Sequence, residues 1–535
     1  MRIIGFHSGH DCAYCVLEDG IPVVHEELER INRVKQSSGD SIELYNERGY
    51  AKDTDSTFCH HFNNGGHNAL IEYPDSYHKL MDRPDSSFYD PGHHGAHAAN
   101  AFFTSDYDKS LIFTIDAGGW ERNVQGELSP SMEVGVAMPT STAVWRGEKN
   151  KIWHEKIYTM HLDIGGVWHK ILEPVFGLSA GPPKGNQAGT LMAMASVGDG
   201  SKYYDHIVNN FHYTRIDYKW LKEEHDSSDQ APFDIARALQ DATEYHLRNL
   251  IARHIKPEDK DLCFAGGVAL NSVALGKVFD WFPQVENIFV PPAPYDGGLA
   301  IGTAQYIYHH FLGYPRVKDN KNASPYLGKK YTEEEVLAAL EAAGDKIEFH
   351  EAPVSELVDK LLDAKIVSVF NGGSESGRRA LGNRSILADP RNPDMKDIIN
   401  EKVKHRQWFR PFAPSILAEE TANWFTRDVY SPYMSVVLPF KEEVRDKVPA
   451  VVHLDGTGRL QTVTEELNPW YYNFLKDWHK ASGVPIILNT SFNDREPIVE
   501  TPENAINCFL GTNIDNLYFV ETGIMVSKTN KGEDS

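Results

Sequence analysis

The stretch Leu262-Cys-Phe-Ala-Gly-Gly267-Val-Ala-Leu-Asn271 sets the expectation for the fold. A short apolar run ends in two glycines, and residues 268–279 then follow a helical pattern, which is typical of a buried strand that turns into a helix. The same design of apolar run, glycine-rich turn and helix is expected at residues 111–119 and 288–309. This alternation predicts an α/β fold over the first ~310 residues.

A polar segment separates this region from the rest of the chain. Residues 313–330 are rich in proline, lysine and asparagine, and a helix with a capping-box start follows at Thr332. The remainder contains a basic cluster and a buried-looking strand at residues 485–489. We therefore expect two α/β domains, residues 1–325 and 326–535.

Composition and charge exclude several classes of protein. The 535 residues are 41% hydrophobic and carry a net charge of −23, so disorder is excluded and no nucleic-acid partner is expected. We find no signal peptide and no apolar run of membrane-spanning length, which predicts a soluble, cytoplasmic protein without a membrane partner. Five cysteines fit a reducing compartment, and the Cys12/Cys15 pair is more typical of a strand than of a metal site.

Two histidines and two aspartates form a candidate metal site. His93 and His97 are four residues apart in an expected helix, so both side chains point to one side of it. Asp116 and Asp296 stand at the ends of two expected strands and offer carboxylate oxygens. Two imidazoles with two carboxylates suit iron, manganese or zinc, and the sequence does not choose among them. The alternative is a histidine-rich surface turn.

The glycine-rich turns are candidate phosphate-binding segments, because such turns let phosphate oxygens approach backbone N–H groups. Neither a Walker motif nor a complete Rossmann fingerprint is present. The argument therefore depends on the repeated placement of glycines after strands. The glycines concerned are Gly118, Gly119, Gly266, Gly267 and Gly297.

A basic segment in the second half predicts an anion site. Arginine side chains match phosphate oxygens bidentately, and the aromatic and proline residues around Arg410 indicate partial burial. A solvated basic face is the alternative. The cations are Arg378, Arg379, Arg384, Arg391, Lys396, Lys402, Lys404, Arg406 and Arg410, and the polar residues Asn489, Thr490 and Ser491 end the later strand.

These motifs resemble the carbamoyltransferase family of antibiotic and nodulation-factor biosynthesis. The resemblance runs through nearly the whole chain in one order. It is carried by residues 4–11 and 26–30, by His93-x-x-x-His97, by residues 115–118, 265–271 and 295–302, and then by residues 379–391, 404–414 and 488–493.

The resemblance implies an actin-like ATPase fold for the first domain and a YrdC-like fold for the second. It implies that the second domain makes carbamoyl adenylate from ATP, used with Mg, and carbamoyl phosphate. Arg379, Arg384, Lys404, Arg410, Asn489 and Ser491 would bind these substrates. The first domain, with Asn271 among its nucleotide-binding residues, would then transfer the carbamoyl group to a hydroxyl of a small molecule. Iron is the expected metal, with manganese or zinc as alternatives.

His10 is the expected general base for transfer, because an imidazole titrates near neutral pH, and Asp11 could serve beside it. A structural histidine is the alternative. Residues 377–379, 493–497 and 186–190 depart from the family pattern, and we expect altered substrate geometry there. A tRNA threonylcarbamoyl-transfer enzyme and a non-catalytic ATP sensor are the competing functions. The oligomeric state stays open, with a homodimer as one expectation.

Overall fold

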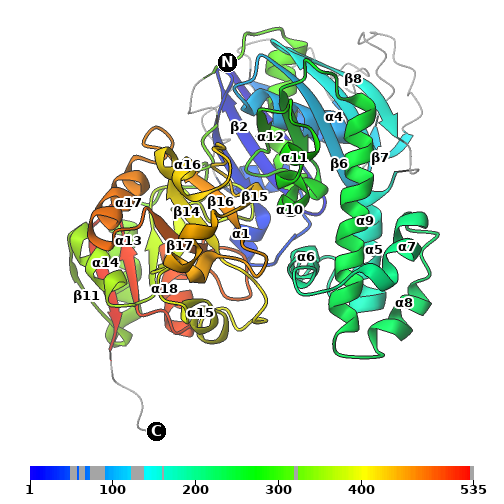
Figure 1. The fold of residues 1–535 in the computed structure, drawn as a ribbon. Coiled ribbons are helices and arrows are strands. Elements are labelled where there is room, and N and C mark those ends of the chain that lie inside the picture. The colour runs from blue at the N-terminus through cyan, green and yellow to red at the C-terminus, as the bar shows by residue number, and fades with distance from the viewer. Residues whose placement is uncertain are drawn as a thin grey trace. The chain divides into compact units, whose positions relative to one another are not determined.

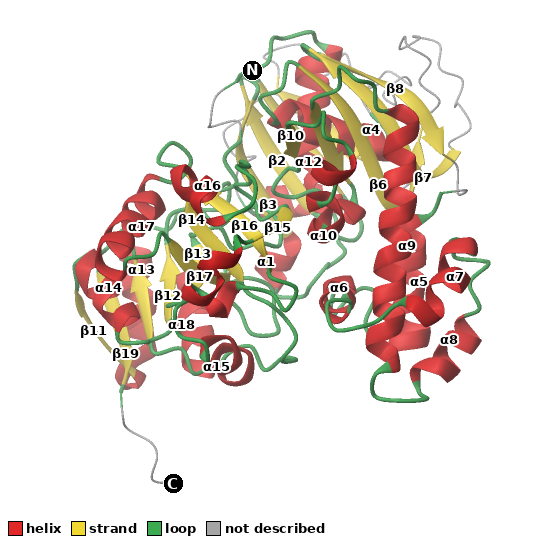
Figure 2. Ribbon diagram, in the orientation of Figure 1, coloured by secondary structure: helices red, strands yellow, loops and turns green. Residues whose placement is uncertain are grey.

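The computed structural model describes residues 1–48, 57–59, 67–72, 91–121, 138–158, 162–318 and 323–529. The chain divides into two compact units, Met1–Ser324 and Pro325–Ser535 (Figure 1). The division lies next to the boundary expected from the sequence. Both units combine strands and helices, so the α/β class is confirmed (Figure 2). None of the helices among the described residues is both long and apolar enough to span a membrane.

The first sheet of the N-terminal unit has the strand order β3-β2-β1-β5-β4 and is antiparallel. Strand β2 pairs with both β1 and β3 and forms a hairpin with β3. Cys15 lies in β2 and Cys12 just before it, and both are buried, as expected of strand residues. The strands are β1 (Arg2–His7), β2 (Ala13–Glu18), β3 (Ile21–Glu27), β4 (Thr57–Cys59) and β5 (His67–Glu72), with the short helices α1 (Leu28–Asn32) and α2 (Ser41–Glu47) after β3.

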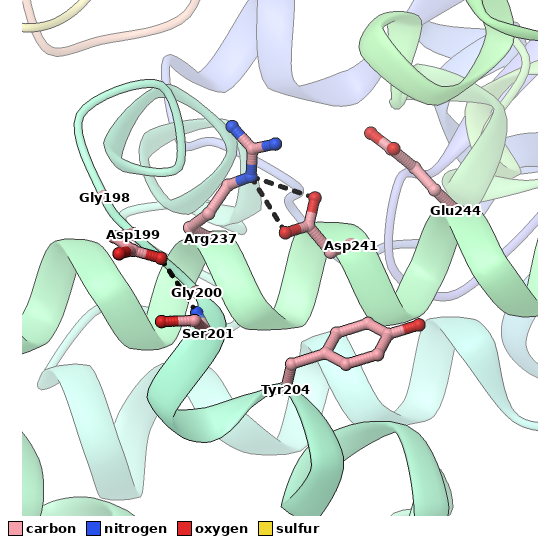
Figure 3. Close-up of a pocket in the computed structure, with 8 residues that line it drawn as sticks. All are labelled: Gly198, Asp199, Gly200, Ser201, Tyr204, Arg237, Asp241 and Glu244. Carbon is pink, nitrogen blue, oxygen red and sulfur yellow. Dashed lines mark hydrogen bonds and ion pairs between the residues drawn. The ribbon is translucent and has the colours of Figure 1, made fainter.

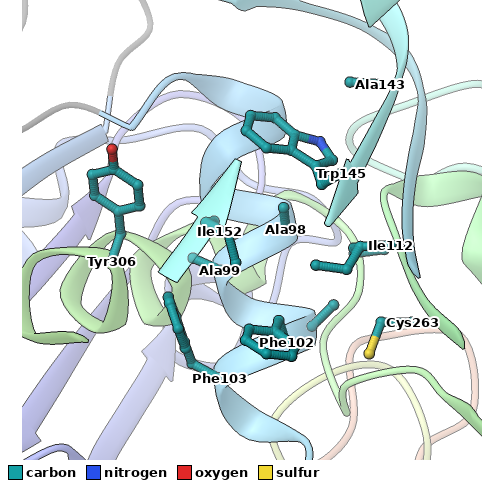
Figure 4. Close-up of a cluster of buried hydrophobic side chains, with 12 residues drawn as sticks. Ala98, Ala99, Phe102, Phe103, Ile112, Ala143, Trp145, Ile152, Cys263 and Tyr306 are labelled. Carbon is teal, nitrogen blue, oxygen red and sulfur yellow. The ribbon is translucent and has the colours of Figure 1, made fainter. Parts of the chain in front are cut away.

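The second sheet has the order β10-β9-β6-β7-β8, parallel from β10 to β6 and antiparallel beyond. Helix α4 packs on β6 and β9, and α12 packs on both α4 and β1. Phe102 and Phe103 of α4 meet Ile112, Trp145 and Cys263 in a shared core (Figure 4). The elements are β6 (Lys109–Glu121), β7 (Met138–Glu148), β8 (Lys151–Tyr158), β9 (Asp261–Ala265), β10 (Asn287–Phe289), α4 (His93–Thr104) and α12 (Leu299–Gln305).

Further helices complete this unit. The long α9 packs against α5, α6, α7, α8 and α10. The helix expected at residues 268–279 is broken into η3, α10 and α11, because Asn271 caps α10 with its side chain. The elements are α5 (Ile164–Phe176), α6 (Ala188–Met194), α7 (Ser201–Asn209), α8 (Tyr218–His225), α9 (Ala231–His254), η3 (Gly267–Leu270), α10 (Ser272–Gly276), α11 (Val278–Trp281), η4 (Asp296–Gly298) and the π-helical η5 (Tyr306–Phe311).

The C-terminal unit is built on a nine-stranded mixed sheet of order β11-β19-β18-β12-β13-β17-β14-β16-β15. The predicted capping box at Thr332 and the strand at 485–489 are confirmed. The strands are β11 (Ile347–Glu351), β12 (Val367–Phe370), β13 (Arg384–Ala388), β14 (Ala413–Leu417), β15 (Val436–Pro439), β16 (Thr457–Val463), β17 (Ile486–Ser491), β18 (Asn516–Phe519) and β19 (Ile524–Lys528).

Helices α14 and α17 pack together, as do α13 and α18, and α14, α17 and α18 contact the sheet. The helices are α13 (Glu333–Ala343), α14 (Val354–Leu362), α15 (Met395–Lys402), α16 (Thr421–Trp424), α17 (Pro469–Ser482) and α18 (Pro502–Gly511), with short 3-10 turns η6 (Gly344–Lys346), η7 (Ala418–Glu420), η8 (Glu442–Lys447) and η9 (Pro449–Val451).

Strand β6 differs from its expected form. The sequence predicted a strand ending at Ile115, a glycine turn and then a helix, but β6 continues to Glu121 and pairs with β7. The pairing register shifts between Ile115 and Gly119, so that Asp116, Ala117 and Gly118 form a bulge. The prediction of a turn and helix here was therefore wrong. The bulge instead presents Asp116 from within a strand.

The segment between the units is anchored at both ends. Arg316 donates to the carbonyls of Phe102, at 2.7 Å, and of Ser105 and Tyr107, at the C-terminal end of α4. On the other side, the Tyr326 hydroxyl donates to the Leu381 carbonyl at 2.9 Å. The cation at a helix C-terminus also opposes the negative end of the helix dipole. Each end of the linker thus belongs to the unit that it contacts.

Candidate metal and phosphate sites

Four side chains predicted as metal ligands come together in the N-terminal unit. His93 and His97 occupy successive turns of α4, Asp116 comes from the β6 bulge and Asp296 opens η4. The Nε2 atom of His97 lies 3.3 Å from Asp116 Oδ2 and 3.4 Å from Asp296 Oδ1, and His93 Nε2 lies 4.0 Å and 3.8 Å from the same two atoms. One ligand atom from each residue fits within 4.8 Å of the others.

The donor set fits a cation. Both ring nitrogens of His97 are enclosed, and neither makes a well-aligned hydrogen bond to a described residue. Burial lowers the pKa of His93 to about 4, whereas the attraction of Asp116 and Asp296 outweighs burial and raises the pKa of His97 to about 9. The two carboxylates thus favour positive charge at the place where a metal ion would supply it.

Backbone groups orient the Asp116 carboxylate. Its Oδ2 accepts from the Gly267 N–H at 2.8 Å and its Oδ1 from the Ala117 N–H at 2.6 Å. Both imidazoles, and above all His97, outweigh burial and hold the pKa of Asp116 below its usual range. A fixed, ionised carboxylate is what a metal ligand needs. The glycine turn after β9 therefore contributes to this site through Asp116.

Gly119 is required for the position of His93. A Cβ atom at Gly119 would fall 2.3 Å from His93 Cδ2, whereas one at Gly118 would meet no described atom within 4 Å. We expect Gly119→Ala to displace the His93 ring and to weaken metal binding by about tenfold or more. Gly118→Ala is the matched control and should keep the metal. Metal content after dialysis against a graded chelator measures both, and equal retention by the two variants would contradict this account.

Glu121 and His94 hold the metal-bearing helix in place. The buried Glu121 accepts the N–H groups of His94 and Gly95 through Oε2, at 2.8 and 3.3 Å, and so caps the start of α4. His94 bonds Thr114 Oγ1 at 3.0 Å and the Thr140 carbonyl at 3.1 Å, and burial lowers its pKa to about 3. His94 therefore has a packing role and is not one of the four clustered ligands. The sequence reasoning did not find Glu121, whose partners are backbone groups.

His10 lies beside the four ligands. Its Nδ1 is 3.3 Å from Asp11 Oδ2, and its Nε2 is 3.3 Å from Asp296 Oδ2. The Asp11 hydrogen bond, helped by Asp296 and Asp116, raises the pKa of His10 to about 9. A general base must be unprotonated, so this shift opposes the predicted role as long as the carboxylates are uncompensated. Asp11 is buried and also accepts from Gln36 Nε2 at 3.1 Å.

The candidate nucleotide-binding residues divide into two groups. Gly267 touches Asp116, Gly266 packs on the Ile115 carbonyl, and Gly297 follows Asp296 and faces Glu27. Asn271 forms the second group, and its hydrogen bonds are to residues other than the four candidate metal ligands. It caps α10 by accepting from Ala274 N and exchanges two hydrogen bonds with Gln240, at 3.0 and 3.2 Å.

An open pocket of about 710 Å³ lies next to Gln240, between the start of α7 and the side of α9 (Figure 3). Gln240 donates to Glu244 at 2.9 Å, and Glu244 lines the pocket. Arg237 is held by Asp241 at 2.9 Å, and Tyr204 adds an aromatic ring. The other lining residues are Gly198, Asp199, Gly200 and Ser201. No sequence motif pointed to this pocket, since its residues come from separated helices.

Two of the predicted phosphate ligands in the C-terminal unit are engaged with protein acceptors. Arg384 is fully buried, donates to the carbonyls of Asn371 at 2.6 Å and Gly372 at 3.0 Å, and stacks on Phe370. The Lys404 ammonium donates to Asn493 Oδ1 and Asn493 O, both at 2.6 Å, and to Ser491 O at 2.8 Å. A direct contact of these two cations with substrate stays a prediction.

These contacts also account for one altered segment. Asn493 Oδ1 accepts hydrogen bonds from Lys404 Nζ and Ser491 Oγ, and Asn493 Nδ2 donates to the Glu496 carbonyl at 2.7 Å. The 493–497 loop is therefore closed by side-chain contacts without a glycine. Near a second altered segment, residues 377–379, the buried Glu375 accepts three backbone N–H groups, those of Leu381, Asn383 and Arg384, at 2.7 to 3.1 Å. Glu375 thus fixes the loop that carries Arg378 and Arg379.

Four other arginines form a cationic cluster. The positive charges of Arg379, Arg406 and Arg410 all act on Arg459, and burial with these like charges holds its pKa well below the usual value. Burial also lowers the pKa of Arg406 and of Arg410. In the described chain no ion pair joins Arg406, Arg410 or Arg459 to a carboxylate. The four arginines are half-buried. Half-buried cations of like charge without counter-charges are unfavourable, so this cluster points to an anionic ligand.

The sequence reasoning missed Arg459. It lies in β16, far beyond the basic segment that ends at Arg410, and only the sheet brings it back. Its alternation with Gln461 on one strand face was the available signal.

Comparison with known proteins assigns the family. Residues 47–305 match the model described as Carbamoyltransferase N-terminus, and residues 358–527 match Carbamoyltransferase C-terminus. Nodulation protein NolO of Bradyrhizobium diazoefficiens is 33% identical, over 79% of this chain and 77% of its own. The chain belongs to the carbamoyltransferase family. Nodulation protein NolNO of Sinorhizobium fredii is another relative of this carbamoyltransferase, 31% identical over 98% of the chain and 80% of its own.

Membership makes the chain an enzyme that transfers a carbamoyl group. Nodulation protein U of Sinorhizobium fredii is 35% identical over 49% of this carbamoyltransferase and 44% of its own length. The metal cluster lies in the part matched by the N-terminal model, and all four clustered arginines lie in the part matched by the C-terminal model. His10 and Asp11 precede the residues matched by the N-terminal model.

Proposed function

We propose that this carbamoyltransferase activates carbamoyl phosphate with ATP and transfers the carbamoyl group to a hydroxyl of a small molecule. The observation that carries the proposal is the cluster of Arg379, Arg406, Arg410 and Arg459. Both co-substrates are polyanions, and the chain as a whole is strongly negative, so a half-buried cluster of four cations is otherwise hard to justify. Arginine forks would bind the phosphates and stabilise charge that develops on them.

The activation step balances with one water. Water releases inorganic phosphate from carbamoyl phosphate, and an oxygen of the resulting carbamate attacks the α-phosphorus of ATP as pyrophosphate leaves. The product is carbamoyl adenylate, and Mg would accompany ATP as co-substrate. We assign this step to the C-terminal unit, with a YrdC-like fold. Asn489 and Ser491, at the end of β17, would orient the carbamoyl end.

We assign transfer to the N-terminal unit, with an actin-like fold. His93, His97, Asp116 and Asp296 would hold a divalent metal, with iron as the first expectation and manganese or zinc as alternatives. When bound, the metal supplies Lewis acidity toward a carbonyl or phosphoryl oxygen. His10, between Asp11 and Asp296, would exchange a proton with the acceptor hydroxyl.

The pocket beside α9 supports nucleotide binding in this unit. Glu244 offers carboxylate oxygens to ribose hydroxyls, and Gln240 links it to Asn271. The N–H groups of Gly297 and of Gly118 in the β6 bulge would face phosphates. Those of Gly266 and Gly267 already donate to the Pro294 carbonyl and to Asp116 Oδ2, so these two glycines would act by shaping the turn. The relatives' names connect them with nodulation, and for this chain the acceptor is proposed only as a small-molecule hydroxyl.

The test is incubation of the full chain with ATP, carbamoyl phosphate and candidate hydroxyl compounds. We expect exchange of labelled pyrophosphate into ATP that depends on carbamoyl phosphate, and a product heavier by one carbamoyl group. Absence of exchange with the metal-loaded protein would contradict the proposed activation step. Transfer to tRNA, with binding that weakens steeply with salt, would favour the threonylcarbamoyl alternative instead.

A further inference from the structure

A buried amide in the C-terminal unit has an unusual hydrogen-bond balance. Asn489 is 1% exposed, and its Nδ2 donates to Gln461 Oε1 at 2.9 Å, to Ser415 Oγ at 3.1 Å and to the Ala380 carbonyl at 3.2 Å. Its Oδ1 is enclosed and accepts no hydrogen bond from any described residue. A buried acceptor left unpaired destabilises the fold, so its persistence calls for an explanation.

The orientation of this amide is fixed by two backbone carbonyls. Gln461 Nε2 donates to the Leu381 carbonyl at 2.9 Å, so Gln461 must turn its Oε1 toward Asn489 and Ser415. Ser415 donates to the same oxygen at 2.5 Å. Reversing Asn489 would set its oxygen against both Gln461 Oε1 and the Ala380 carbonyl. Asn489 is therefore held with its nitrogen inside the network and its oxygen outside it.

The free acceptor and the arginine cluster share one face of the sheet. β14 lies between β16 and β17, with Gln461 opposite Ser415 and Asn489 opposite Ala413. Arg459 precedes Gln461 by two residues, so its side chain projects from the same face of the sheet. Two strand spacings, roughly 10 Å, separate Arg459 and Asn489 in the plane of the sheet. The small Ala413 stands between the two strands.

We propose that Asn489 Oδ1, held in this orientation by Gln461, accepts an N–H of the carbamoyl group and selects carbamoyl phosphate against acyl phosphates. The inference rests on the proposed function. The role of Gln461 in positioning Asn489 and the selection of an N–H donor by Asn489 Oδ1 go beyond that function. A methyl group in place of the amino group offers no donor and leaves the buried acceptor unpaired, and sites of this kind discriminate strongly against such analogues.

Unreactive phosphonates test this inference directly. Phosphonoacetamide keeps the amino group of carbamoyl phosphate, and acetonylphosphonate replaces it with methyl. Calorimetry with the full chain should give at least about tenfold tighter binding of phosphonoacetamide. In Gln461→Met the two affinities should converge, because phosphonoacetamide binding weakens while acetonylphosphonate binding is kept. Asn489→Leu should give the same convergence.

Tyr471 provides the discriminating control. Its hydroxyl is buried beside Ser415 and Asn489 and makes no well-aligned hydrogen bond to a described residue, so it is another group that could bind the amino group. Tyr471→Phe should keep the preference for phosphonoacetamide. Loss of the preference in Tyr471→Phe, or its survival in both Gln461→Met and Asn489→Leu, would overturn the inference.

Pyrophosphate exchange distinguishes a failure of this inference from a failure of the proposed function. Equal binding of the two phosphonates by a protein that exchanges pyrophosphate with carbamoyl phosphate would overturn this inference alone. Absence of both exchange and phosphonate binding would overturn the proposed function with it. Thermal melts of Gln461→Met and Asn489→Leu identify any variant that fails to fold, and binding of inorganic phosphate should persist in both.

Discussion

We expect the His97→Ala protein to lose its bound metal and its carbamoyl transfer, and to retain pyrophosphate exchange. His97 is fully buried and lies closer to both carboxylates than His93 does. Alanine removes the ligand and leaves the two carboxylates facing a space that only water fills. We expect metal affinity and transfer rate to fall by at least about a hundredfold, since even outer-shell changes cost ten- to a hundredfold.

Metal analysis and product mass spectrometry give two independent readouts for His97→Ala. His225→Ala is the matched control, because His225 lies on α8 and pairs with Asp226, away from the four ligands. It should keep both metal and transfer. Full metal content in His97→Ala would contradict the assignment of the centre. Parallel loss of pyrophosphate exchange would contradict the division of the two steps between the units.

We expect Arg459→Met to abolish activation while making the protein more stable. Arg459 is half-buried near Arg379, Arg406 and Arg410, and its enclosed Nε makes no hydrogen bond within the described chain. Methionine fills similar space without the desolvation and repulsion of the cation. We expect exchange to fall by about a thousandfold and stability to rise by about 1–3 kcal/mol. Binding energy for anions and folding stability are in direct conflict at this position.

Arg391→Met is the matched control for Arg459→Met. Arg391 is also an arginine of the C-terminal unit, but it forms a bidentate pair with Asp389 at 2.7 to 3.0 Å. Its replacement should lower stability slightly and leave exchange nearly unchanged. Inorganic pyrophosphate should raise the melting temperature of the wild type and of Arg391→Met, and should have little effect on Arg459→Met. A less stable Arg459→Met protein with normal exchange would contradict the assignment of an anion site.

Local patterns were sufficient to predict much of the N-terminal site. The 3.6-residue period placed His93 and His97 on one side of a helix, and the position of each aspartate after an apolar run brought Asp116 and Asp296 to the same edge. The bulge in β6 was not predictable, because the sequence pattern of a strand does not show where its pairing register shifts. Glycine there allows close packing against His93, whereas we had expected a turn.

The C-terminal site depended more on contacts between distant segments. Gln461 contacts Asn489, and Arg459 shares its face of the sheet, because β14 joins β16 to β17, an order that no local pattern encodes. Sequence also identifies a cation without showing where it points. Arg384 and Lys404 fit the basic pattern, yet their donors are taken up by carbonyl and amide oxygens of the unit itself.

The hydrogen bonds of Arg316 to the end of α4 determine where a metal-binding fragment of the first unit must end. Arg316 lies beyond the last helix of that unit, and it ties down the helix on which His93 and His97 stand. A protease that cleaves before residue 316 would release a fragment that contains all four metal ligands and lacks this clamp. Such a fragment would bind metal less tightly than one that ends after Lys318. The border of the metal-binding half is therefore set by this arginine.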